Sequence, residues 1–227
     1  MIGRSLSQVT GHDVAHESPF DLLETLRWTP DAGFFLLERH LRRLQASARH
    51  FGFRCSPEDV REALAGTVAS ANHALRVRVL VGRNGAVCVE RTALEPATGT
   101  LRVGLAAKPI DPTNPFLFHK TTNRIEQEQA RSSAYDDMVL WNPAREITEA
   151  MTANIVVDLD GRAVTPPVEC GLLAGTLRAE LLATGEIREE RISIDQLLGA
   201  PRFWLINSVR GWRPAVLSST MSDPCAR

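Results

Sequence analysis

Lysine is the residue type whose use in this sequence points to chemistry. Among 26 lysines and arginines, only Lys108 and Lys120 are lysine. Arginine keeps its proton at physiological pH, whereas a lysine with a lowered pKa can act as a nucleophile or a base. A biased codon usage is the alternative explanation for so few lysines. Lys120 stands in FLFHKTTNR, between a β-like apolar stretch and a predicted helix, so we expect it to be the reactive lysine.

Glu149 is the acid that best fits a site with Lys120. It lies in EITEAMTANIVV, where Thr152, Asn154 and an apolar strand follow it. A glutamate in this context is hard to explain as an ordinary surface residue, although a solvated acid in a turn is the alternative.

A phosphate site is predicted where PPVECGLLAGTLRAELL turns into a helix. Gly171 and Gly175 precede this helix, and the backbone amides of Thr176 and Leu177 begin it. Free amides at a helix start bind phosphate, favoured by the helix dipole. A simple helix cap is the alternative. Ser208, in NSVRGW on a late strand edge, offers a hydroxyl as a second phosphate donor.

Two arginines of LRVRVLVG are candidates for binding a substrate carboxylate. Arg76 and Arg78 are two positions apart on a predicted strand, so both side chains lie on one face. Arginine binds a carboxylate through two parallel hydrogen bonds. Either of the two could make this contact.

Several classes of site are excluded by what the sequence lacks. It has no Gly-rich dinucleotide or Walker motif, no G-x-S-x-G and no H-E-x-x-H, and its six histidines do not cluster. The four cysteines, Cys55, Cys88, Cys170 and Cys225, show no C-x-x-C spacing, so we expect free thiols, no zinc and no other metal.

Composition and charge narrow the class of partner. A net charge of −1 gives no electrostatic case for binding nucleic acid or an acidic membrane. The N-terminus lacks the apolar core of a signal peptide, and no apolar run reaches membrane-spanning length. We therefore expect a cytoplasmic protein whose ligand is a small molecule.

Predicted strands and helices are mixed without strict alternation, which indicates an α+β fold. The predicted strands are 20–28, 34–37, 75–82, 86–94, 101–110, 137–142, 153–161, 163–167 and 203–209. The predicted helices are 38–51, 56–71, 123–133, 175–183 and a short one after Asp195. We expect a poorly ordered lead-in at 1–19, a small N-terminal α+β subdomain at 20–111, a C-terminal subdomain at 116–217 and a disordered tail at 218–227. Pro112 and Pro115 mark the linker.

Five segments in this order resemble the class IV aminotransferase family: HLRRLQASA, FHKTTNR, EITEAMTANIVV, TPPVECGLLAGTLR and INSVRGW. The resemblance extends from about Phe20 to Val216. The family comprises branched-chain and D-amino-acid aminotransferases and 4-amino-4-deoxychorismate lyase, and FDLLETLRW, HKTTNR and NSVRGW look most like the lyase. It implies the two-subdomain fold of fold-type IV enzymes, like that of D-amino-acid aminotransferase, with pyridoxal 5'-phosphate as cofactor in the C-terminal subdomain.

The resemblance also implies a role for each candidate residue. It makes Lys120 the Schiff-base lysine and Glu149 the partner of the pyridine nitrogen. The remaining implied contacts are Arg43, the amides of Thr176 and Leu177 and the Ser208 hydroxyl for the phosphate, Leu173 for the ring, and Arg76 or Arg78 for the substrate.

Three functions follow from the resemblance. The first is a lyase that converts 4-amino-4-deoxychorismate to 4-aminobenzoate and pyruvate for folate synthesis, supplied by an aminodeoxychorismate synthase. The second is a branched-chain or D-amino-acid aminotransferase, although Ile125 and Leu177 replace a tyrosine and a threonine common in those enzymes. The third is a catalytically silent dimer, which the short N-terminus suggests. A homodimer is implied in every case.

Overall fold

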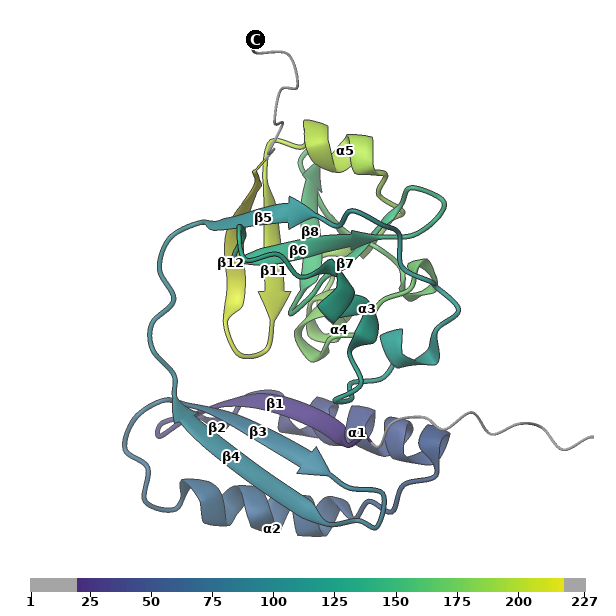
Figure 1. Cartoon of the computed structure of the whole chain (residues 1–227). Helices are drawn as coiled ribbons and strands as arrows, with labels where there is room; N and C mark the ends of the chain where they lie inside the picture. Colours follow the sequence, from purple (N-terminus) through teal and green to yellow (C-terminus); the bar gives the residue numbers. More distant parts are fainter. Residues whose placement is uncertain (1–19, 219–227) are drawn as a thin grey trace, which may run out of the picture.

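The computed structural model describes residues 20–218, which form two β-sheets with their own helices (Figure 1). Figure 1 shows the eight-stranded sheet stacked above the four-stranded sheet. The mixture of strands and helices confirms the predicted α+β class. The predicted lead-in at 1–19, and the predicted tail apart from residue 218, lie outside the described residues.

The four-stranded sheet has the order β2-β1-β3-β4. Its strands are β1 (Leu22–Thr29), β2 (Gly33–Phe34), β3 (Leu75–Val81) and β4 (Val87–Ala93), and its helices are α1 (Leu37–Phe51) and α2 (Pro57–Val68). In β3 Leu75, Val77, Val79 and Val81 are buried and the arginines between them are not, because alternate side chains point to opposite faces. The apolar face packs against α1 and α2, which leaves the arginine face free.

The eight-stranded sheet has the order β10-β9-β8-β11-β12-β5-β6-β7. Its strands are β5 (Leu101–Leu105), β6 (Asp137–Trp141), β7 (Ile147–Ala150), β8 (Asn154–Leu159), β9 (Arg162–Thr165), β10 (Arg188–Glu189), β11 (Phe203–Asn207) and β12 (Gly211–Leu217). The helices beside it are α3 (Ile125–Ala130), α4 (Thr176–Ala183) and α5 (Ile194–Gly199), with 3-10 turns η1 (Pro115–Leu117) and η2 (Val168–Cys170).

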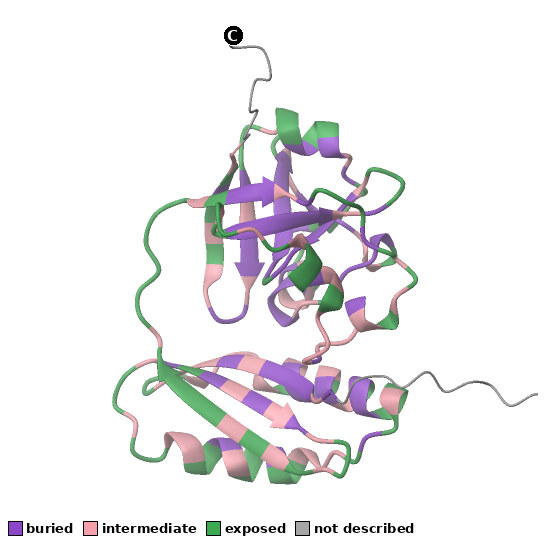
Figure 2. Cartoon of the chain, viewed as in Figure 1, coloured by how far each residue is buried: buried purple, intermediate pink, exposed green. Residues whose placement is uncertain are grey.

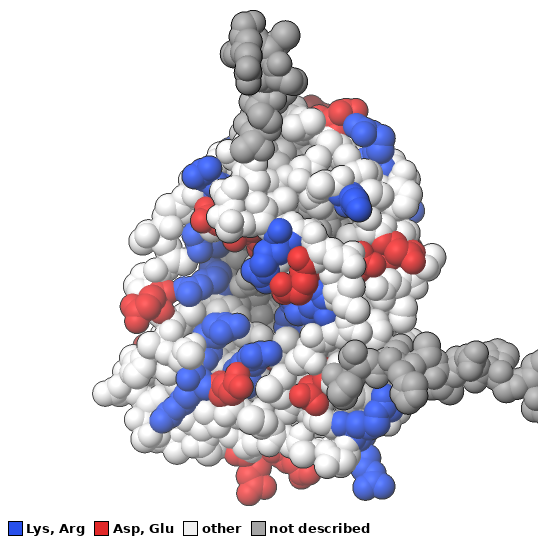
Figure 3. All heavy atoms as spheres, in the orientation of Figure 1, with Lys and Arg blue, Asp and Glu red and all other residues white. Residues whose placement is uncertain are grey.

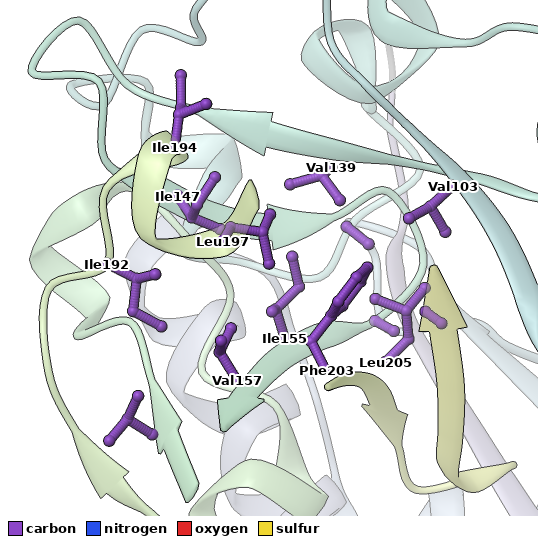
Figure 4. Packing of buried hydrophobic residues seen from close by; sticks show 14 residues of the cluster. Val103, Val139, Ile147, Ile155, Val157, Ile192, Ile194, Leu197, Phe203 and Leu205 are labelled. Carbon is purple, nitrogen blue, oxygen red and sulfur yellow. The ribbon is translucent and has the colours of Figure 1, made fainter. Parts of the chain in front are cut away.

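One hydrophobic core holds the larger sheet together. Figure 4 shows Val139, Ile155, Phe203 and Leu205 of the three strands β6, β8 and β11 packed together, with Leu197 of α5 against them. Figure 2 shows β6, β8 and β11 of this sheet largely buried, whereas β4 of the smaller sheet is largely exposed. The larger sheet is therefore a firm platform for residues at the ends of β7, β8 and β11.

The structure corrects several predicted elements. Three strands, β7, β10 and β12, were not predicted, the strand predicted at 101–110 ends at residue 105, and the helix predicted at 123–133 spans only 125–130. β7 carries Thr148 and Glu149 in a fully buried strand, so it has no polar–apolar alternation, and Pro214 interrupts the strand pattern of β12. Residues 94–100 connect β4 of the smaller sheet to β5 of the larger sheet. The subdomain division at Pro112 and Pro115 stays a prediction.

Candidate active site

Lys120 is carried by a segment that returns from the larger sheet to the edge of β1. The amide of Leu23 donates to the Lys120 carbonyl at 2.9 Å, and the amide of Thr122 donates to the Asp21 carbonyl at 2.9 Å. Leu22 and Thr121 form an antiparallel bridge between these bonds. The backbone of Lys120 is therefore hydrogen-bonded to β1 of the small sheet, although the residue follows β5 in sequence.

A cavity of about 440 Å³ is lined by residues of both sheets and brings most of the candidate residues together. Figure 3 shows lysine and arginine side chains gathered around a hollow between the two halves of the molecule. The candidates that line the cavity are Arg43, Arg76, Arg78, Lys120, Glu149, Leu173, Thr176 and Ser208. The Leu177 side chain is instead buried in a core cluster with Val156 and Ile206. Its backbone amide, in the first turn of α4, is the part to which the sequence assigned a role.

Lys120 and Glu149 have strongly shifted pKa values at this cavity. Burial, reinforced by the positive charge of Arg43, lowers the pKa of Lys120 to about 8. Burial raises the pKa of Glu149 to about 8, against the opposing effects of the Leu173 amide and Lys120. An amine that loses its proton near pH 8 can act as a nucleophile or a base.

Glu149 is held in place by two hydrogen bonds. Asn154 Nδ2 lies 3.3 Å from Glu149 Oε2 and also donates to the Leu173 carbonyl at 2.8 Å. The amide of Leu173 donates to the same Glu149 oxygen at 3.3 Å. Asn154 thus ties the acid to the loop that carries Leu173, so both face the cavity in a fixed relation.

A buried network that the sequence did not predict orients Arg43. Arg43 Nε lies 2.8 Å from Glu24 Oε1, and Arg43 Nη2 lies 2.7 Å from Glu24 Oε2. The His40 ring connects Glu24 Oε2, 2.7 Å from Nδ1, to Thr176 Oγ1, 3.2 Å from Nε2. Burial alone would raise the pKa of Glu24, but Arg43 and His40 lower it to about 2.

A sequence signal for this network did exist. Glu24 lies on β1 at the same parity as Leu22 and Leu26, which face the core, so an acid there requires a buried partner. His40 precedes Arg43 by one turn of α1, on the same helix face.

The turn before α4 lies close against the Asn154 side chain. A Cβ atom on Gly175 would lie 2.0 Å from Asn154 Oδ1, so only glycine fits before Thr176. Arg43 Nη1 donates to the Ala174 carbonyl at 3.2 Å and so lies beside this turn. Helix amides and a guanidinium favour a phosphate, Glu149 a basic ring nitrogen, and Lys120 an electrophilic carbonyl carbon. The donor set fits a ligand that carries all three groups.

Three arginines at the cavity have no acidic partner among the described residues. Arg124 Nη2 donates to the Met151 carbonyl, and Arg210 Nη1 donates to the Glu95 carbonyl. Arg76 forms no ion pair with any residue of 20–218, whereas Arg78 has a long contact of 3.4 Å with Glu90. Within residues 20–218, the cavity therefore carries arginine charges that no acidic side chain pairs with.

Within residues 20–218, no group of three histidine, cysteine or acidic side chains is placed to hold a metal ion. The cysteines of this range, Cys55, Cys88 and Cys170, are free. Cys225 lies outside the described residues. None of the helices in the same range is long and apolar enough to cross a membrane.

Comparison with known proteins gives consistent similarities. Residues 21–217 match the model of the family "Amino-transferase class IV". Over 202 residues, 84% of this chain and 86% of the relative, the sequence is 31% identical to the "Putative aminodeoxychorismate lyase" of Schizosaccharomyces pombe. Over 105 residues, 43% of this chain and 29% of the relative, it is 40% identical to "Branched-chain-amino-acid transaminase 1" of Bacillus subtilis.

A solved structure agrees with these similarities. The crystal structure of a "Putative amino-acid aminotransferase" from Mesorhizobium loti superposes with a TM-score of 0.84 at 38% identity. The superposition covers 88% of this chain and 100% of the other.

Proposed function

The chain belongs to the class IV aminotransferase family of pyridoxal-phosphate-dependent enzymes, and from that membership we propose that it is a lyase converting 4-amino-4-deoxychorismate to 4-aminobenzoate and pyruvate. The relative named as an aminodeoxychorismate lyase aligns over most of both chains, which supports this choice. Position 125, where aminotransferases of the family commonly have a tyrosine, carries the exposed Ile125.

The residues of the cavity fit pyridoxal phosphate and a step of proton transfer. Lys120 would bind the cofactor through Nζ, Glu149 would pair with its ring nitrogen, and Arg43, with the start of α4, would hold its phosphate. When bound, the cofactor supplies a cationic ring that withdraws electrons from the amine-bearing carbon of the substrate. Lys120 would take the proton from that carbon at Nζ and return it to the departing enolpyruvyl group.

The observation that carries the proposal is the positive charge of Arg76, Arg124 and Arg210 at the cavity. The substrate of the lyase has two carboxylates, which can each bind a guanidinium through charge-assisted hydrogen bonds. A branched-chain amino acid has only one carboxylate and an aliphatic side chain. Three arginines without acidic partners among residues 20–218 suit the substrate with two carboxylates better.

Amino-acid transamination is the second candidate function. It is favoured by the name of the Mesorhizobium loti protein, at 38% identity over its full length, and by the shorter match to the Bacillus subtilis transaminase. The same Lys120 and Glu149 would serve both reactions, so the cofactor site does not distinguish them.

Incubation of the purified protein with 4-amino-4-deoxychorismate distinguishes the two candidates. We expect release of 4-aminobenzoate and pyruvate in equal amounts, and little transfer between pairs of amino acids and keto acids. Arg76→Ala and Arg210→Ala should each raise KM at least about tenfold, the worth of one hydrogen bond to a charged group. Arg188→Ala, at an exposed position of β10, is the matched control. Rapid transamination without aromatic product would overturn the lyase proposal.

The setting of the reaction is also a proposal. We infer a cytoplasmic homodimer that receives its substrate from an aminodeoxychorismate synthase. Copurification of the lyase and synthase activities would test this supply. Direct transfer of the substrate from the synthase to the lyase, without its release into the medium, would test it as well.

A further inference from the structure

His119 lines the same cavity as Lys120 and directly precedes it, yet the proposed reaction assigns it no role. Its Nδ1 lies 3.0 Å from the hydroxyl oxygen of Ser47 on α1. Ser47 is only 2% exposed and follows Arg43 by one helical turn, so the face of α1 that carries Arg43 also binds His119.

Two aromatic contacts fix the His119 ring in addition to this hydrogen bond. The His50 ring stacks on it, with centroids 4.2 Å apart and an interplanar angle of 27°. The Phe51 ring meets it edge to face at 5.0 Å. A half-buried imidazole with one bonded nitrogen and two packed neighbours has little freedom to turn.

The segment that carries Lys120 is therefore attached on two sides. After Lys120, the backbone pairs with β1 through the bridge between Leu22 and Thr121. Before Lys120, the side chain of His119 is attached to α1 through Ser47. Backbone pairing on one side leaves the preceding residue free to rotate, so the attachment of His119 adds a second constraint on the direction in which the Lys120 side chain enters the cavity.

We propose that His119 is a positioning residue for Lys120, and that its hydrogen bond to Ser47 aims the amine toward the reacting carbon. This inference rests on the proposed role of Lys120 and holds for either candidate reaction. Burial, together with the nearby His50, lowers the pKa of His119. The ring is therefore neutral near pH 7 and places no additional positive charge beside the amine.

The presence of only two lysines permits a direct test on the full-length chain freed of cofactor. Lysine labelled with ¹³C at Cε should give one signal from Lys108 and one from Lys120 in an NMR titration. We expect the Lys120 pKa near 8 in the wild type, rising toward 10.5 in Ser47→Ala and His119→Gln, because a lysine that reaches water loses the effect of burial. The same variants of the loaded enzyme should lose at least about tenfold in kcat with a smaller change in KM, the effect of misplacing a catalytic group.

His119→Asn is the rescue variant, because the asparagine amide takes nearly the place of Nδ1 and can still bond Ser47. It should keep the Lys120 titration and most of kcat. His73→Gln, at an exposed histidine outside the cavity, controls for the loss of an imidazole. Wild-type titration and kcat in both Ser47→Ala and His119→Gln would overturn the proposal, as would an asparagine variant as defective as the glutamine one.

The test separates this inference from the proposed function. The NMR titration needs no substrate, so a wild type without lyase activity but with the expected shifts in the variants would disprove only the lyase reaction. Ser47→Ala lies within α1, where alanine is a good helix former, so this variant should fold even if the His119 variants do not.

Discussion

Lys120 and Glu149 have opposite pKa shifts with one physical cause, which is burial of a charge at the cavity. Burial favours the neutral form of both groups, so the free amine and the neutral acid become accessible near pH 8. Such shifts are common at catalytic sites, because a base must be able to lose its proton near the working pH.

The two lysines provide the first prediction. We expect the purified protein to show the visible absorption band of bound pyridoxal phosphate, and Lys120→Ala to abolish it, because the amine is lost. Lys108→Ala, at an exposed position, should keep the band. A spectrum recorded before and after dialysis decides the result. The assignment is wrong if the Lys108 variant loses the band and the Lys120 variant keeps it.

The second prediction concerns the charge of Glu149. Glu149→Gln keeps the shape of the side chain but cannot hold the ring nitrogen of the cofactor protonated. We expect normal folding and a loss of at least about a hundredfold in kcat, since an electrostatic partner in a dry site contributes several kcal/mol. Turnover close to that of the wild type would show that Glu149 is not part of the site.

The same variant should alter the pH dependence of stability in the cofactor-free protein. The pKa of Glu149 is raised to about 8 from an ordinary value of 4.5, so the folded chain holds the proton more tightly than the unfolded chain. The protonated Glu149 carboxyl therefore contributes stability to the folded chain below pH 4.5, and this stability is lost as pH rises toward 8. Glu149→Gln should therefore match the wild type at pH 4 and be more stable by a few kcal/mol at pH 8.5, at about 1.4 kcal/mol per pKa unit. Chemical unfolding at the two pH values measures the difference.

At the scale of elements, the approach of β8 to the start of α4 limits which residue can occupy position 175. We predict that Gly175→Ala lowers the affinity for pyridoxal phosphate at least about tenfold, because the new Cβ would collide with Asn154 and displace the turn. Gly66→Ala, inside α2 with open space around it, should keep that affinity and gain about 0.5–1 kcal/mol of stability. Fluorescence titration with the cofactor compares the two, and unchanged affinity in Gly175→Ala would contradict this account.

The elements that could be predicted from the sequence are those with a local signal. Helix α2 begins at Ser56 and Pro57 as predicted, and the hydroxyl of Ser56 accepts the Asp59 amide at 3.0 Å. Strand β7 could not be predicted, because it is an edge strand whose polar side chains are buried. Its sequence therefore shows no alternation of polar and apolar residues. The return of residues 120–122 to β1 could not be predicted either, since pairing between distant segments leaves no local pattern.

The candidate site residues also divide into those with a local sequence signal and those without one. The scarcity of lysine and the neighbouring sequence pointed to Lys120 and Glu149, and the structure places both at one cavity. The roles of Arg43 and Leu173 came only from the family resemblance and stay predictions. Glu24 and His40 were missed, because their importance comes from contacts between β1, α1 and α4.

At the scale of the whole molecule, we predict a homodimer whose activity falls on dilution into the monomer range. Large apolar side chains of β12 stay exposed in the single chain, with Trp212 at 38% and Val216 at 49%. Covering such surface with a second copy contributes about 25 cal/mol per Å² removed from water, offset in part by the entropy of association. Light scattering should give twice the chain mass of 25.0 kDa. A fully active and fully loaded monomer would contradict the prediction.

Because residues of both sheets line the cavity, a cofactor bound there would connect the two halves of the protein. Lys120 and Arg43 are attached to β1 and α1, whereas Glu149 and Leu173 belong to the larger sheet and its loops. A molecule bound to all four resists any separation of the halves, so loading should raise the cooperativity of melting. In scanning calorimetry we expect the loaded chain to show one sharp endotherm whose calorimetric and van't Hoff enthalpies agree. The cofactor-free chain should show a broader endotherm whose calorimetric enthalpy exceeds the van't Hoff value, because its halves then melt separately.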